Sequence, residues 1–144
     1  MTAGPFRRVL VGWDASADAT EALSAAAAIV RAGAGHVVAL TVVPDARGSE
    51  AAGQRASEFA IRRRAEDRFE RMRESAAAGV RMSLHIVEDR QVGRAVCTYA
   101  AEHGFDLLVL GRHGDGAVRR TRLGRVAEAA AKDSVVPVLL LSAE

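Results

Sequence analysis

Short apolar segments alternate with longer segments of helical periodicity along the chain, and this alternation constrains the fold most. Five segments are predicted as strands because they are short and rich in Val, Leu and Ile. The predicted strands cover Phe6–Trp13, His36–Val43, Val80–Val87, Phe105–Leu110 and Val135–Leu141. The predicted helices run from Ala17 to about Ala32, from about Ala56 to Ala78, from Gln91 to His103, and onward from Gly124. Such alternation predicts an α/β fold, in which a parallel five-stranded sheet carries helices on both faces.

The order of the strands follows from the pattern of the third one. Val80–Val87 alternates apolar and polar residues, which is typical of a half-exposed strand at the edge of a sheet. With right-handed crossovers this fits the order 3-2-1-4-5 of a doubly wound, Rossmann-like domain. The first and fourth strands are then neighbours, and ligands bind at the carboxyl ends of strands where the winding reverses. Asp14 and Gly111, which follow these two strands, are therefore expected to share one crevice.

Polar residues and prolines are expected to end the elements. Ser16 is the predicted N-cap of the first helix, and Asp89 is a candidate cap for the third. Asp45–Arg55 has the composition of a loop. The last strand, Val135–Leu141, contains Pro137, which strands tolerate best at an edge. Pairing with a second copy would cover this apolar edge and give a homodimer; the alternative is a monomer whose own helices cover the strand.

Composition excludes several classes of protein. The 144 residues suffice for one domain, residues 1–144, with its own core, and no apolar run is long enough to span a membrane. The N-terminal residues lack the layout of a signal peptide. Cys97 is the single cysteine, so no intrachain disulfide is possible and a cytoplasmic protein is expected. Because no apolar run is long enough to span a membrane, no membrane partner is expected. Cys97 is interpreted as a packing thiol, and the scattered histidines offer no metal-binding spacing.

Positive charge is concentrated late in the chain. The formal net charge is only +2, yet six basic and two acidic residues lie between Arg112 and Lys132. No aromatic residue is interspersed among them to stack on bases, so the pattern favours a small polyanion over a nucleic acid. The helix Ala56–Ala78 mixes both signs of charge at helical spacing, which indicates a solvated helix face.

A glycine-rich loop joins the fourth strand to the last helix. The stretch from Leu107 to Val126 ends its apolar run at Gly111 and continues through Gly114 to Gly124, where helical periodicity begins. Glycine lets the main chain approach a ligand closely, and the free N–H groups at a helix N-terminus favour negative charge. The stretch therefore predicts a phosphate-binding loop, and the alternative is a plain connection whose glycines serve packing.

The spacing Gly111-x2-Gly114-x9-Gly124, with Asp14 and the five-fold alternation, resembles the universal stress protein family over the whole chain. The resemblance implies that the ligand is ATP or a related adenine nucleotide, with or without Mg²⁺. It implies that the glycine loop holds phosphates and ribose, and that the end of the second strand lines the adenine site. The expected binding residues are Trp13, Asp14, Val42, Val43, Gly111, Arg112, His113, Gly114, Gly124, Arg125 and Val126.

Four of these residues leave alternatives open. Arg125 stands where the family motif has Ser or Thr, so it either pairs with a phosphate or occupies the phosphate's space. Asp14 either contacts the ligand, stabilises the start of a helix, or accepts a phosphoryl group with the help of Asp18. His113 is either a ligand contact or an exposed loop residue. Trp13 either packs at the end of the first strand or walls the crevice beside a base.

The expected function is that of a regulator in stress adaptation that responds to a bound adenine nucleotide, with little or no turnover. No general base is evident, and Asp14 is the one obvious carboxylate for a metal-bound water. Two alternatives remain: a slow ATPase or related nucleotide-hydrolysing enzyme, and a nucleotide-free protein-interaction module of the same fold. Homodimerisation through Val135–Leu141 is implied by the resemblance, and no nucleic acid is expected as a partner.

Overall fold

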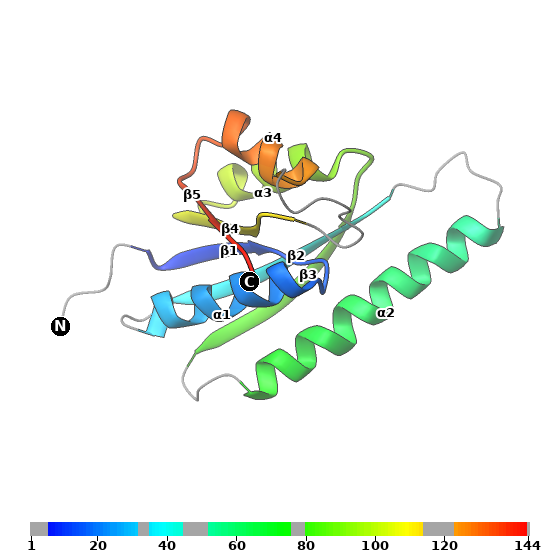
Figure 1. Cartoon of the computed structure of the whole chain (residues 1–144), viewed down its shortest axis with the longest axis horizontal. Helices are drawn as coiled ribbons and strands as arrows, with labels where there is room; N and C mark the ends of the chain where they lie inside the picture. The colour runs from blue at the N-terminus through cyan, green and yellow to red at the C-terminus, as the bar shows by residue number, and fades with distance from the viewer. Residues whose placement is uncertain (1–5, 32–34, 45–51, 76–79, 114–122, 144) are drawn as a thin grey trace.

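The computed structural model describes residues 6–31, 35–44, 52–75, 80–113 and 123–143, and Gly114 lies outside these ranges. Five strands and four helices alternate along the chain (Figure 1). The strands are β1 (Arg8–Gly12), β2 (His36–Val43), β3 (Arg81–Glu88), β4 (Leu107–Gly111) and β5 (Val138–Leu141). The helices are α1 (Ala17–Arg31), α2 (Ala52–Ser75), α3 (Val92–Glu102) and α4 (Arg125–Asp133). All paired strands are parallel in the order β3-β2-β1-β4-β5, so the predicted fold class and strand order are confirmed.

The sheet is covered by helices on both faces. α1 and α2 lie on one face, and α3 and α4 lie on the other (Figure 1). Alternate residues of the central strands enter the two layers: Val9 and Val11 pack under α1, while Leu10 packs under α3 and α4. Because both faces of β1, β2 and β4 are buried, their sequences are apolar almost throughout.

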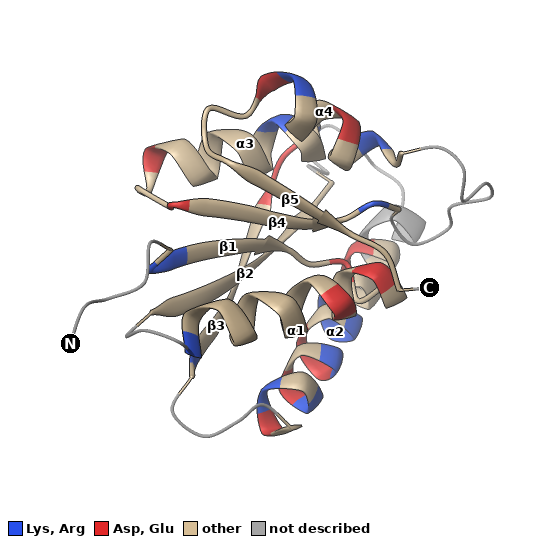
Figure 2. Cartoon of the chain, turned by 60° about the vertical axis from the view of Figure 1, so that its left-hand side comes forward, with Lys and Arg blue, Asp and Glu red and all other residues tan. Residues whose placement is uncertain are grey.

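Helix α2 carries both signs of charge along its outer face (Figure 2). Its buried contacts come from Ala65 and Phe69, and Met72 is partly buried beside them. The exposed Arg63 pairs with Asp67 at 4.0 Å, and the half-buried Arg62 pairs with Glu58 at 3.2 Å, both one helical turn apart. Exposed pairs of this kind contribute little energy, so the predicted solvated face fits the geometry.

The predicted starts of α2 and of the last strand are wrong. Helix α2 begins at Ala52, so the predicted loop Asp45–Arg55 ends earlier, and residues 45–51 lie outside the described ranges. The last strand begins at Val138 instead of Val135, whose side chain is 83% exposed. Pro137 precedes the strand and takes part through its carbonyl, which accepts a 2.9 Å hydrogen bond from the Leu108 amide. Proline has no N–H to donate, so regular pairing starts one residue later.

The capping prediction is confirmed for α1 and wrong for α3. Ser16 Oγ accepts a hydrogen bond from the Ala19 amide at 3.1 Å, as an N-cap does. The N-cap of α3 is Gln91, whose side chain makes no capping bond. Asp89 instead accepts a hydrogen bond from the Gln91 amide at 2.9 Å, which makes a turn before the helix.

The end of α3 explains why β4 starts later than predicted. Gly104 has a positive φ of 68°, and the Phe105 amide donates to the Ala100 carbonyl at 3.0 Å. This is the arrangement by which a glycine commonly ends a helix. Phe105 therefore belongs to the helix end, and the strand begins at Leu107.

Among the described residues, no helix combines the length and apolar character that crossing a membrane requires.

Candidate functional site: a crevice between strands β1 and β4

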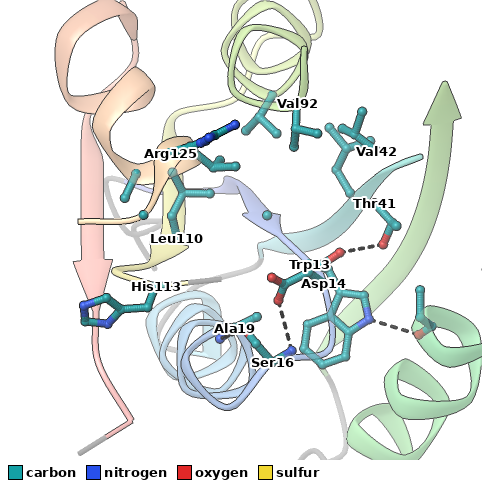
Figure 3. Close-up of a pocket in the computed structure, with 18 of the residues that line it drawn as sticks. Trp13, Asp14, Ser16, Ala19, Thr41, Val42, Val92, Leu110, His113 and Arg125 are labelled. Carbon is teal, nitrogen blue, oxygen red and sulfur yellow. Dashed lines mark hydrogen bonds between the residues drawn. The ribbon is translucent and has the colours of Figure 1, made fainter. Parts of the chain in front are cut away.

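A crevice of about 840 Å³ opens at the carboxyl ends of β1 and β4, where the winding of the sheet reverses. This volume lies within the usual range of small-molecule sites. Its walls come from the segment after β1, the end of β2, the middle of α2, the first half of α3, and the start of α4 (Figure 3). Eight of the predicted residues line it: Trp13, Asp14, Val42, Gly111, His113, Gly124, Arg125 and Val126.

The other three predicted residues do not line the crevice as described. Val43 is fully buried in the core, because successive side chains of a strand point to opposite faces and Val42 already faces the crevice. The Arg112 side chain is exposed, while its amide donates to the Leu141 carbonyl at 2.7 Å. Gly114 lies outside the described residues. Asp14 and the glycine stretch are expected to share one crevice, and Gly111 and Gly124 line the same crevice as Asp14.

Trp13 both packs and walls the crevice. Its indole Nε1 donates to the Ala65 carbonyl at 3.0 Å, and its ring meets Phe69 edge to face with centroids 6.4 Å apart. These contacts fix α2 against the segment after β1. The Trp13 carbonyl accepts a 2.7 Å hydrogen bond from Thr41 Oγ1, which ties the same segment to β2. The floor of the crevice is thus held from two sides.

Asp14 is positioned by a tight turn between β1 and α1. One of its carboxylate oxygens accepts a hydrogen bond from the Ser16 amide at 3.0 Å. Between them, the buried Ala15 has a φ of 63°, a left-handed conformation that a residue with a Cβ seldom adopts. Backbone strain of this kind gathers where surrounding structure fixes a functional geometry.

The main chain at the end of β2 faces the crevice. Strand β1 ends beside Leu40, whose carbonyl accepts the Trp13 amide at 2.9 Å. On the other side of β2, the Val43 carbonyl accepts the Asp89 amide at 3.0 Å. Because main-chain groups of alternate residues point to the same side of a strand, the N–H and C=O of Val42 face the gap where β1 has ended. A donor and an acceptor thus stand side by side at the crevice.

Arg125 is the first residue of α4, and its side chain is exposed. It lies across the crevice from Trp13 and Asp14, on the same side as Val92 (Figure 3). The N-cap of the helix is Gly124, which supplies no side-chain hydrogen bond to the first turn. The helix therefore presents its N-terminal N–H groups and a cation at one wall of the crevice, which favours an anion there.

His113 and Asp18 form a buried pair that the sequence did not reveal. Asp18 Oδ2 accepts the His113 amide at 3.1 Å and lies 3.0 Å from His113 Nδ1, while Oδ1 accepts the Ala143 amide at 2.8 Å. Both residues are almost fully buried, so the interpretation of His113 as an exposed loop residue is wrong. Asp18 lies 95 positions before His113, and an acidic residue in the first turn of a helix gives no sign of so distant a partner.

The environment of Asp18 keeps its carboxyl ionised. Burial raises the pKa of this carboxyl, but the hydrogen bonds from Ala143 and His113 outweigh burial and hold the pKa below its ordinary value. Since these groups engage Asp18, it is not placed as a second carboxylate for a metal beside Asp14. Within the described ranges, no cluster of His, Cys, Asp and Glu has the geometry of a metal site.

Cys97, in α3, carries a free thiol. It is half-buried beside the α3 and α4 core. Burial and the negative charge of Asp133 raise the pKa of its thiol, which disfavours the thiolate that a nucleophile requires. The geometry fits the packing role expected from the sequence.

The fold and the crevice define a class: a doubly wound α/β domain whose ligand site lies where the strand order reverses. The model of the universal stress protein family matches residues 5–142. The chain belongs to the universal stress protein family, as the glycine spacing and Asp14 had indicated. A comparison of the sequence with curated proteins finds no match.

Several solved structures share the fold. The universal stress protein UspA from Lactobacillus plantarum has a TM-score of 0.77 at 20% identity, over 97% of this chain and 99% of that one. A universal stress protein in complex with cAMP has a TM-score of 0.65 at 25% identity, over 99% of this chain and 100% of that one. A family member from Arabidopsis thaliana with AMP bound has a TM-score of 0.65 at 17% identity, over 94% and 91% of the two chains.

Proposed function

We propose that the crevice binds an adenine nucleotide, and that the protein acts as a ligand-responsive regulator in stress adaptation. The observation that carries this proposal is the pairing of two features across one crevice. The Val42 main chain offers a donor and an acceptor on one wall, and the N-terminus of α4 with Arg125 offers positive charge on another.

Adenine matches the groups at the end of β2. Its N6 amino group donates and its N1 accepts, so the base can pair with the Val42 C=O and N–H as a neighbouring strand would. Apolar side chains from α2 and α3, Ile61 and Val92, line the crevice and can cover the faces of a flat ring. Both are partly exposed, at 40% and 36%, which is typical of side chains that a ligand covers.

The phosphate end matches the opposite wall. The first N–H groups of α4 and the exposed Arg125 guanidinium can both approach a phosphate. AMP and cAMP, each with a single phosphate, are bound in two solved structures of the same fold. They support the proposal that a ligand with one phosphate is enough for binding. We therefore choose AMP as the first probe and treat ATP and ADP as comparisons.

Isothermal titration with AMP, cAMP, ADP and ATP tests the proposal. We expect saturable heat with at least one of these nucleotides and with one site per chain. If none of the four produces heat at millimolar concentrations, the crevice does not bind adenine nucleotides and the proposal is wrong.

Substitution of Arg125 separates the two roles that the sequence left open. We expect Arg125→Ser to weaken AMP binding about fivefold to tenfold, the usual contribution of one partly exposed charged hydrogen bond. Adenosine has no phosphate, so its affinity should change less than twofold. Arg112→Ser is the matched control, because Arg112 is exposed near the same loop and does not line the crevice. A gain of AMP affinity in Arg125→Ser would mean that the arginine blocks the phosphate position.

We also propose that the chain forms a homodimer through β5. The strand lies at the edge of the sheet, and its side chains are only partly buried. The Pro137 carbonyl accepts a hydrogen bond from the Leu108 amide in β4, and the Leu141 carbonyl accepts one from the Arg112 amide just after β4. The main-chain groups of Val138 and Leu140 therefore face outward. An apolar edge with outward N–H groups is suited to pairing with a second copy.

Sedimentation equilibrium tests the dimer. Wild-type protein should sediment at twice the chain mass of 15.2 kDa. Leu140→Pro removes an outward N–H and should give a monomer, while Leu140→Ala removes similar packing but keeps that donor and should remain a dimer. A wild-type monomer at every concentration, or equal behaviour of the two variants, would contradict pairing through β5.

A further inference from the structure

We infer that Asp18 is the positioning residue of the ligand crevice, because its buried carboxylate fastens the start of the β4–α4 loop to the first turn of α1. The inference rests on the proposed nucleotide function. Asp18 itself is not among the described residues that line the crevice, so its role is exerted through the segments that it holds.

The carboxylate joins three segments that are distant in sequence. One oxygen accepts hydrogen bonds from both the amide and the ring nitrogen Nδ1 of His113, the second residue after β4. The other oxygen accepts one from the amide of Ala143, the second residue after β5. Asp18 is 2% exposed and His113 is 5% exposed, so water is largely excluded from these contacts. Hydrogen bonds to a buried charge are strong and costly to lose.

The end of β4 is pressed against the same turn of α1. A Cβ added to Gly111 would lie 2.6 Å from Asp18 Cβ and 2.9 Å from its main-chain carbon. The end of β4 thus touches α1 in the very turn whose carboxylate holds His113. That turn is also capped by Ser16, which lines the crevice beside Asp14. The positions of Gly111 and His113 relative to Asp14 are therefore set at Asp18.

The histidine is oriented by this arrangement. An ionised carboxylate beside Nδ1 requires that nitrogen to carry a proton. In the part of the chain that the structure describes, the buried Nε2 has no hydrogen-bond partner. The ring is directed away from Thr41 and Val42 (Figure 3), so His113 reaches the crevice beside Gly111 while its ring is held outside the centre. We assign His113 to the support of the loop together with Asp18.

The experiment compares Asp18→Asn with Asp106→Asn. Asp106 is a suitable control because its carboxylate accepts the amides of Arg7 and Arg8 at 3.0 Å and 2.9 Å, nearly a hundred positions away, at the opposite end of β4. Both variants should lower the thermal midpoint. At a temperature where both are folded, Asp18→Asn should weaken AMP binding about tenfold, whereas Asp106→Asn should leave it within twofold.

Adenosine binding distinguishes a positioning role from a general loss of stability. A general loss of stability would weaken adenosine and AMP binding equally and leave the ratio of the two affinities unchanged. The Gly124 amide donates to the Arg112 carbonyl at 2.7 Å, so the segment that Asp18 anchors also holds the start of α4, where the phosphate is proposed to bind. Asp18→Asn should therefore weaken AMP binding more than adenosine binding and reduce the AMP-to-adenosine affinity ratio about fivefold or more. An unchanged ratio, or an AMP affinity equal to that of wild type, would overturn the positioning role.

Amide exchange separates this inference from the proposed function. In ligand-free protein, Asp18→Asn should speed hydrogen exchange at His113 and Ala143 about tenfold or more, with no comparable change in Asp106→Asn. If wild-type protein binds no adenine nucleotide but exchange accelerates as expected, the proposed function fails and the anchoring by Asp18 stands. If exchange at both amides is unchanged, the carboxylate does not hold the loop and the inference is wrong.

Discussion

AMP should bind at least about a hundredfold more tightly than GMP or IMP. Adenine presents a donor at N6 and an acceptor at N1, while guanine and hypoxanthine present an acceptor at position 6 and a donor at N1. The Val42 C=O and N–H, which face the gap beyond β1, would then meet groups of the same kind. Two mismatched polar contacts at about 1.5 kcal/mol each, within the usual cost of a buried polar group left unsatisfied, correspond to about a hundredfold or slightly more.

Two further ligands grade this effect. The monophosphate of 2,6-diaminopurine keeps the N1 and N6 groups of adenine and should bind within about tenfold of AMP. Purine riboside monophosphate lacks only the N6 donor and should lose about tenfold relative to AMP. Equal affinities for AMP and GMP would show that the end of β2 does not select the base.

Gly111→Ala should destabilise the fold and reduce AMP binding together. The new methyl group would overlap the main chain of α1, which cannot yield as the tip of a flexible side chain does. Overpacking against a fixed element costs about 1–3 kcal/mol or more. Any relaxation must move β4 away from α1. That movement lengthens the contacts between Asp18 and His113, which hold the segment after β4 in place.

Gly104→Ala is the control for this prediction. Gly104 has a φ of 68°, and a Cβ added there meets nothing within 4 Å. Its substitution should therefore cost only the backbone strain of about 1–2 kcal/mol and leave the AMP dissociation constant unchanged. Chemical unfolding and titration of both variants provide the comparison. If Gly111→Ala is as stable as wild type and binds AMP equally well, the close contact between β4 and α1 is not what holds the loop.

Much of the fold could be predicted because it rests on local patterns. β1, β2 and β4 are apolar almost throughout since both of their faces are buried, and β3 alternates since it lies at an edge. Ser16 caps α1 by a local rule, and Asp14 and Gly111 approach each other because they follow adjacent strands. Each of these results needs only periodicity, turn chemistry and the topology of parallel sheets.

The errors arose where contacts distant in sequence decide the structure. Pro137 lies within an apolar run of the sequence, which predicts a strand from Val135 onward. The pairing with β4 shows that the Pro137 carbonyl accepts a hydrogen bond, while Val135 is exposed and lies before the strand. The burial of His113 depends on Asp18 and on the segment after β5. Val43 was assigned to the site because a sequence does not tell which of two neighbouring strand residues faces the crevice. Such features need the assembled sheet.

The most direct test of the central claim is a titration of isotopically labelled protein with AMP, followed by amide chemical shifts. We expect saturable shifts at Trp13, Val42 and Val126, which line the crevice, and unchanged amides at His36 and Asp106 near the amino ends of the strands. Absence of saturable shifts, or shifts confined to the amino ends, would contradict an adenine-nucleotide site between β1 and β4.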